Sequence, residues 1–144
     1  MVHFTEDNIL RHITLSKSLK LCEAAIAEAI ATGIAISVSV VDSGTNLVAM
    51  QRMENAILLS IEASKGKAVA SVYFASPSGD LVQRNESPVM KALQIQMQGR
   101  FILGQGALPI YETGVLVGAV GVSGGTSQQD EDCARTALNK TGLG

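Results

Sequence analysis

The chain has few aromatic residues and no tryptophan. Aromatic residues make up 3% of its 144 residues and apolar residues 47%. We therefore expect one domain over residues 1–144 with a core of Ala, Val, Ile, Leu and Met. The apolar runs 34–41 and 115–122 are far shorter than the roughly 20 residues of a membrane helix. The first ten residues lack the basic and apolar regions of a secretory signal, so we expect a cytoplasmic protein.

Strong charge and paired cysteines are absent as well. The net charge is −2 and there is no basic block, which argues against nucleic acid or an anionic membrane as partner. Cys22 and Cys133 belong to no CxxC pair, which argues against a zinc site and a disulfide framework. Both cysteines are predicted to be small buried apolar side chains.

Residues 14–33 have the pattern of an amphipathic helix. Thr14 is a predicted N-cap, and Gly33 stands where a helix would end. Apolar residues recur at spacings of three or four and predict one buried face: Leu15, Leu19, Cys22, Ile26 and Ile30.

Two segments are typical of β-hairpins. In residues 34–53, large and small side chains alternate, which predicts one large-residue face and one small-residue face. Asp42-Ser43-Gly44 supplies the turn, with Gly44 suited to positive φ, and the return strand is expected over 46–53. Residues 108–124 predict a second hairpin that turns at 112–114.

Three more helices are expected. The first covers 55–74, where Gly66 predicts close packing; the second starts at Ser87 and Pro88, and the last covers 127–139. The residues expected to face inward in the first are Ile57, Ile61, Val69 and Val72. Hairpins between helices, in place of single strands, favour an α+β fold with an antiparallel sheet.

The stretch VGAVGVSGGTSQQDED, residues 117–132, has the glycines of a phosphate-binding loop but lacks the Gly-Lys-Ser/Thr element. Acidic residues at 130–132 would repel a phosphate, so we interpret the stretch as a helix cap, with Ser127 and Asp130 as the capping pair. Gly118 and Gly121 lie in a predicted strand. Either a helix packs closely on that strand or a flat ligand lies there, and close packing is favoured.

Few side chains suggest chemistry. His3 is expected to be exposed, whereas His12 precedes the first long helix beside apolar residues. Arg52 and Glu54 would lie near a cleft, although a solvated ion pair is the simpler interpretation. The methionines at 50, 53, 90 and 97 are expected to fill the core. No GxSxG, HExxH or Cys/His pattern occurs.

Three segments in order carry a resemblance to a known family: residues 13–29, 38–71 and 106–138. The second contains Val-Val-Asp-Ser-Gly and Arg-Met-Glu-Asn-Ala, and the third contains Gly-Ala-Val-Gly-Val-Ser-Gly. Together they resemble the GlcG/HbpS family of haem-binding-type domains, which also forms the C-terminal domain of PduO-type corrinoid adenosyltransferases. The resemblance implies a profilin-like antiparallel sheet of about five strands, helices on both faces, and homo-oligomers up to octamers.

The resemblance also implies a function. We expect an accessory homo-oligomer that binds haem or a corrinoid and is linked to diol, glycerol or glycolate catabolism, with a diol dehydratase-type enzyme as a possible partner. His12 would be the axial metal ligand, and Arg52 and Lys67 would offset propionate charge.

Two other hypotheses stay open. The chain could be a small enzyme acting on a hydroxy or carbonyl acid, with Arg52, Glu54 and the Pro109 loop lining the pocket. It could instead be a structural subunit that stabilises a partner enzyme. Its low content of charged residues, 17%, predicts that some faces are buried between subunits.

Overall fold

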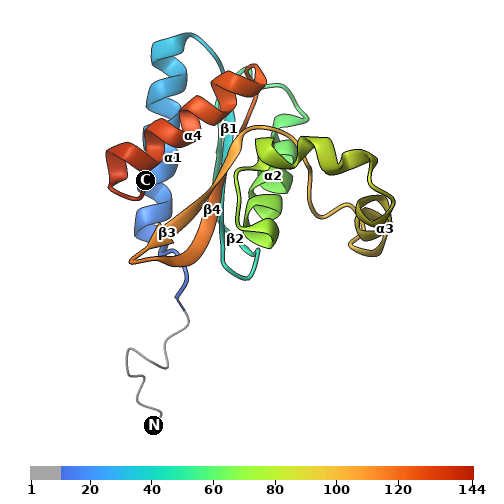
Figure 1. The fold of residues 1–144 in the computed structure, drawn as a ribbon. Coiled ribbons are helices and arrows are strands. Elements are labelled where there is room, and N and C mark those ends of the chain that lie inside the picture. The colour runs from blue at the N-terminus through green and yellow to red at the C-terminus, as the bar shows by residue number, and fades with distance from the viewer. Residues whose placement is uncertain (1–10) are drawn as a thin grey trace.

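The computed structural model describes residues 11–144, which form an α+β fold with helices on both faces of one antiparallel sheet (Figure 1). The elements in order are α1 (Leu15–Thr32), β1 (Ser37–Asp42), β2 (Leu47–Arg52), α2 (Ser60–Phe74), the 3-10 helix η2 (Ser78–Glu86), α3 (Pro88–Gln96), β3 (Ala107–Glu112), β4 (Val115–Ser123) and α4 (Ser127–Thr141). The predicted fold class is confirmed. No helix in this described range is long and apolar enough to span a bilayer.

The sheet has four strands in the order β2-β1-β4-β3, so β2 and β3 are its edges. The expectation of about five strands was wrong. Ile102, in the segment before β3, bonds to a helix and not to a strand: its N–H donates to the Gly66 carbonyl of α2 at 3.0 Å. Gly66 permits this close contact, because a Cβ at this position would lie only 2.6 Å from the Ile102 side chain. The predicted close packing at Gly66 is confirmed.

Helices α1 and α4 cover one face of the sheet (Figure 1). They pack on each other through small residues, which permit a close helix–helix contact. The prediction for the inward face of α1 was right at Cys22 but wrong at three positions, because Leu15, Leu19 and Ile30 are exposed. The residues that α1 buries are Ser18, Leu21, Cys22, Ala25 and Ala29.

Helix α2 covers the other face and touches the small side chains of β1. The Oγ atoms of Ser37 and Ser60 lie 2.8 Å apart, and those of Ser39 and Ser64 lie 2.7 Å apart. Gly121 of β4 pairs with Ser39, and a Cβ at Gly121 would collide with the backbone of α2. Close helix packing therefore explains Gly121, and the small-residue face is confirmed.

Two expected boundaries move in the structure. Helix α2 begins at Ser60, five residues later than expected, and Ile57 is exposed. In the first hairpin, Thr45 and not Gly44 has positive φ, at 66°. The Asp42 carboxylate explains this, because it accepts hydrogen bonds from the N–H groups of Gly44 and Asn46 and so closes the turn around Thr45.

The positions at which α3 and α4 begin, and the turn of the second hairpin, are largely as expected. Ser87 caps α3, and the second hairpin turns through Thr113 and Gly114, both with positive φ. Helix α4, however, is capped by Thr126, which forms a capping box with Gln129. The proposed Ser127–Asp130 pair was wrong because the Asp130 side chain turns inward.

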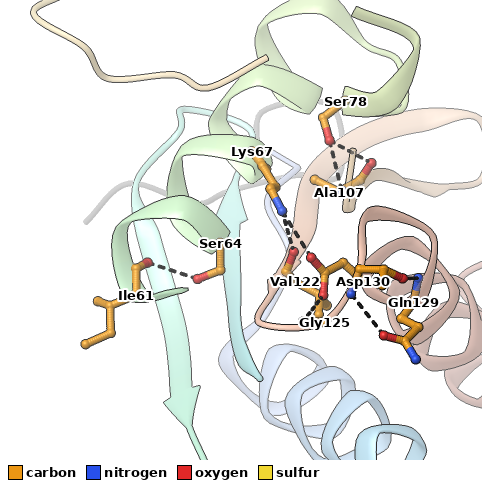
Figure 2. Close-up of polar contacts among 10 residues, drawn as sticks. Ile61, Ser64, Lys67, Ser78, Ala107, Val122, Gly125, Gln129 and Asp130 are labelled. Carbon is orange, nitrogen blue, oxygen red and sulfur yellow. Dashed lines mark hydrogen bonds and ion pairs between the residues drawn. The ribbon is translucent and has the colours of Figure 1, made fainter. Parts of the chain in front are cut away.

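One buried ion pair connects α2 to the first turn of α4 (Figure 2). The Lys67 Nζ donates to the Val122 carbonyl at 3.1 Å and to Asp130 Oδ2 at 3.3 Å, and Asp130 Oδ1 accepts from the Gly125 N–H at 2.8 Å. Lys67 is 9% exposed and Asp130 is 3% exposed. Burial raises the pKa of Asp130, while the Gly125 N–H and the Lys67 charge act in the opposite direction.

The Gly121→Ala substitution tests the contact between α2 and the sheet. The added methyl group would meet backbone atoms of Ser64 and Ala68, which can move only if the helix moves. We expect a loss of about 1–3 kcal/mol in the free energy of unfolding, measured by urea denaturation. Gly104→Ala is the control, because its methyl group would make only ordinary contacts, at 3.6 Å or more. Equal effects of the two substitutions would contradict the proposed role of Gly121.

A second prediction concerns the ion pair. Lys67→Met keeps the length of the side chain but leaves the buried Asp130 carboxylate without its counter-charge. We expect a loss of roughly 3–5 kcal/mol in the free energy of unfolding at pH 7. Adding Asp130→Asn should restore part of the loss, because the amide oxygen can still accept from the Gly125 N–H. A double variant no more stable than Lys67→Met would rule out an uncompensated charge as the cause.

The same pair of variants should respond to pH. With its pKa raised by burial, Asp130 binds its proton more tightly in the folded protein than in the unfolded chain. Its contribution to stability therefore declines as the pH rises above about 4. The deficit of Lys67→Met should grow between pH 4 and pH 7, whereas that of the double variant should not grow, because it has no carboxyl group at position 130.

Candidate functional site

His12 is held at the start of α1 by the turn between β1 and β2. Its Nδ1 lies 2.6 Å from Ser43 Oγ, and Ser43 Oγ also donates to the Arg11 carbonyl at 3.3 Å. A hydroxyl has one proton to donate, so when Ser43 donates to the Arg11 carbonyl the imidazole proton is on Nδ1. Nε2 of the neutral ring then keeps its lone pair, which is the form that binds a metal ion.

The residues next to His12 in the chain include a positive charge and exposed apolar side chains. Arg11 Nη1 donates to Thr113 Oγ1 at 3.0 Å, which ties this segment to the turn between β3 and β4. On the first two turns of α1, Leu15 is 57% exposed and Leu19 is 44% exposed. A cation beside apolar surface is suited to a ligand with a hydrophobic body and anionic groups.

The three predicted cofactor residues do not come together. Arg52 pairs with Ser37 at the opposite end of the hairpin from Ser43. The six residues of β1 separate the two ends, a distance of roughly 20 Å at about 3.3 Å per residue. Lys67 is buried, and its ammonium group is already engaged by Asp130.

The pocket of the enzyme hypothesis is not formed. Arg52 lies on β2 and Pro109 on β3, which are opposite edges of the sheet. Arg52 and Glu54 are both exposed, and no ion pair joins them within 4.0 Å. Across residues 11–144, no group of three or more His, Cys, Asp or Glu side chains could hold a metal ion. His3 lies outside the described residues.

The glycine loop before α4 forms the N-terminal cap of that helix. The Gly125 N–H donates to the Asp130 carboxylate, and Thr126 accepts from the Gln129 N–H (Figure 2). An acidic side chain of the protein thus takes the place where an anion would bind. The interpretation of the loop as a cap is confirmed, although the capping residues differ.

The two cysteines are inert in this structure. Both are buried and free, and they belong to the core between α1, α4 and the sheet. Burial raises the pKa of each thiol to about 11, so both remain protonated at neutral pH. The prediction of small buried apolar side chains is confirmed.

A cavity that the sequence did not reveal lies between the first hairpin, α2 and the segment after α3. Its volume is about 430 Å³. Charged residues at its wall are Glu62, Lys65 and Arg100, and His12 is not among the lining residues. These side chains come from segments far apart in the chain, so no local motif marks them. Gly66 and Val69 also line the cavity, and the sequence analysis had noted both, but only for packing.

Known proteins share this sequence and fold over most of this chain. The family model described as haem degrading protein HbpS-like matches residues 13–139. The chain is 38% identical over 130 residues to an uncharacterised 15.0 kDa protein from the dhaT–dhaS intergenic region of Citrobacter freundii, covering 88% of this chain and 90% of the relative.

Two further matches concern the adenosyltransferase PduO. The chain is 30% identical over 128 residues to the corrinoid adenosyltransferase PduO of Salmonella typhimurium, which covers 87% of this chain and 38% of that protein. A crystal structure of a PduOC:heme complex superimposes with a TM-score of 0.82 at 27% identity, covering 92% of this chain and 97% of the other. With a family model that spans nearly the whole chain, this protein belongs to the HbpS-like family.

Proposed function

We propose that this domain binds haem, with Nε2 of His12 as an axial ligand of the iron. The observation that carries the proposal is the 2.6 Å hydrogen bond between His12 Nδ1 and Ser43 Oγ, because it holds the ring in place and engages Nδ1 and not Nε2. The family and the haem complex of a domain 27% identical to this one support the same ligand. A single imidazole is a sufficient protein ligand for haem iron.

The neighbours of His12 fit the rest of a tetrapyrrole. Leu15 and Leu19 offer apolar contact to the ring, and Arg11 offers a positive charge to a propionate. Arg52 and Lys67 remain predictions for that role, but their positions do not favour it. Arg52 is at the far end of the hairpin, and Lys67 would have to leave Asp130.

The biological setting follows from the relatives and is part of the proposal. One relative is encoded between dhaT and dhaS, and another is a corrinoid adenosyltransferase. We place this chain as a cytoplasmic accessory protein of diol or glycerol catabolism, with a corrinoid as the alternative ligand.

The first experiment is a titration with haemin, followed by absorption at the Soret band. We expect saturable binding with one haem per chain. His12→Ala should abolish the shift, and Ser43→Ala should weaken binding about 10–100-fold, because it removes the partner that orients the ring.

The control is His3→Ala, which removes the other histidine of the chain. It should leave both the Soret spectrum and the affinity unchanged. An unchanged spectrum in His12→Ala would eliminate the proposed ligand. Absence of any specific shift in the folded wild-type protein, with saturable binding of hydroxocobalamin, would favour the corrinoid.

We further propose that the chain assembles into a homo-oligomer through the segment before α2. Ile57, Leu58 and Leu59 are consecutive and are 59%, 80% and 77% exposed. A run of large aliphatic side chains at this level of exposure is typical of a surface that another protein covers. The preceding element in the chain, the edge strand β2, also has an unpaired side that a second copy could approach.

Light scattering at micromolar concentration tests this assembly. The wild-type mass should be a multiple of 15.0 kDa, and Leu58→Asp should lower it because a charge cannot be buried in an apolar interface. Gln96→Asp, a change at another exposed position, should not affect it. A monomeric wild-type protein would refute the assembly, and an unchanged mass for Leu58→Asp would refute this surface.

A further inference from the structure

The cavity of about 430 Å³ beside α2 has the features of a binding site that is separate from His12. Its wall comes from three places in the chain: the β1–β2 turn, the outer side of α2, and residues 98–102. Apolar side chains of Leu47, Val69 and Ile102 line it, and Gly66 adds no side chain. This combination provides an apolar floor with charged groups placed around it.

Arg100 is fixed in place with donors to spare. Its Nη2 donates to the Thr45 Oγ1 at 2.9 Å and to the Thr45 carbonyl at 3.4 Å. Within residues 11–144, Nε and Nη1 make no hydrogen bond, and no carboxylate lies within 4.0 Å of the guanidinium group. Nε–H and Nη1–H lie on different edges of the guanidinium group, because each edge with two parallel donors includes Nη2. Either nitrogen can still donate one charge-assisted hydrogen bond to a carboxylate.

The charges of the cavity indicate the charge of the ligand. Lys65 and Arg100 are positive, and Glu62 is negative, with its Oε2 3.3 Å from Lys65 Nζ. Two positive charges and one negative charge leave a net charge of +1, which a single carboxylate would neutralise. A phosphate dianion would gain less, because Glu62 repels it and the apolar floor offers it no partner.

The backbone around the cavity is held in uncommon conformations. Thr45, Gln98 and Gly99 all line it, and their φ angles are 66°, 55° and 72°. Side chains other than glycine rarely adopt such angles, and the strain is maintained only where surrounding contacts enforce it. Arg100 provides that contact for Thr45, so the residue that would hold a carboxylate also holds the turn in shape.

From these observations we infer that the cavity binds a small organic monocarboxylate, with the carboxylate on Arg100 and the carbon chain on Leu47, Val69 and Ile102. The inference does not depend on haem, because none of the residues that carry it touches His12.

Equilibrium dialysis with radiolabelled hexanoate tests the site in the wild-type protein without haem. This method works for any size of oligomer. We expect saturable binding of one hexanoate per chain at concentrations below about 10 mM. Unlabelled hexanoate should displace the label, whereas equal concentrations of hexan-1-ol or inorganic phosphate should not.

Three variants locate the ligand. Arg100→Gln should weaken binding roughly tenfold or more, because a charge-assisted hydrogen bond is lost. Arg100→Lys should recover only part of the affinity, since it restores the charge but not the fixed position that the bonds to Thr45 give the guanidinium group. Lys91→Gln, which removes a cation on α3 outside the cavity, should bind like the wild type. Circular dichroism shows whether each variant is folded.

Several results would overturn the inference. Equal displacement by hexan-1-ol would mean that the carboxylate is not recognised. Equal displacement by phosphate would mean that the site selects charge and not a monocarboxylate. A folded Arg100→Gln protein with wild-type affinity, or no saturable binding by the wild type, would remove the site itself.

Discussion

The close contact between α2 and the sheet is the constraint on which the rest of this structure depends. Paired serines join the helix to β1, and the absence of a side chain at Gly121 lets the helix backbone lie directly on β4. At this distance the register of α2 cannot vary, because one residue of slip would bring larger side chains against the strand. Lys67 can therefore reach Asp130 past the end of the sheet, and the Ile102 side chain can pack directly against Gly66.

The turn between β1 and β2 connects this scaffold with both candidate sites. The Asp42 carboxylate holds the turn, so the residues on either side of Gly44 have defined directions. Ser43 contacts His12, and Thr45 contacts Arg100. This short turn thus orients His12, the proposed iron ligand, and Arg100, the residue proposed to bind a carboxylate. Neither residue belongs to the hairpin itself.

Charge and exposure separate structural residues from candidate functional ones. Lys67 and Asp130 are buried and satisfy each other, so they contribute to the link between α2 and α4. Among residues 11–144, His12 and Arg100 are held by neighbours on one side only, and each has a nitrogen that makes no hydrogen bond there. Function in this domain is therefore more readily assigned to partly satisfied side chains near the surface than to the buried pair.

The sequence by itself determined the order of helices and strands, the small-residue face of β1, and the family. These features depend on local patterns of residue size, caps and turns, which act over a few residues. Only the tertiary structure decided which side of α1 is buried, because the helix packs on α4 through alanines while Leu15 and Leu19 stay outside. It also decided that Lys67 is occupied and that Arg100 borders a cavity, since both facts depend on segments distant in sequence.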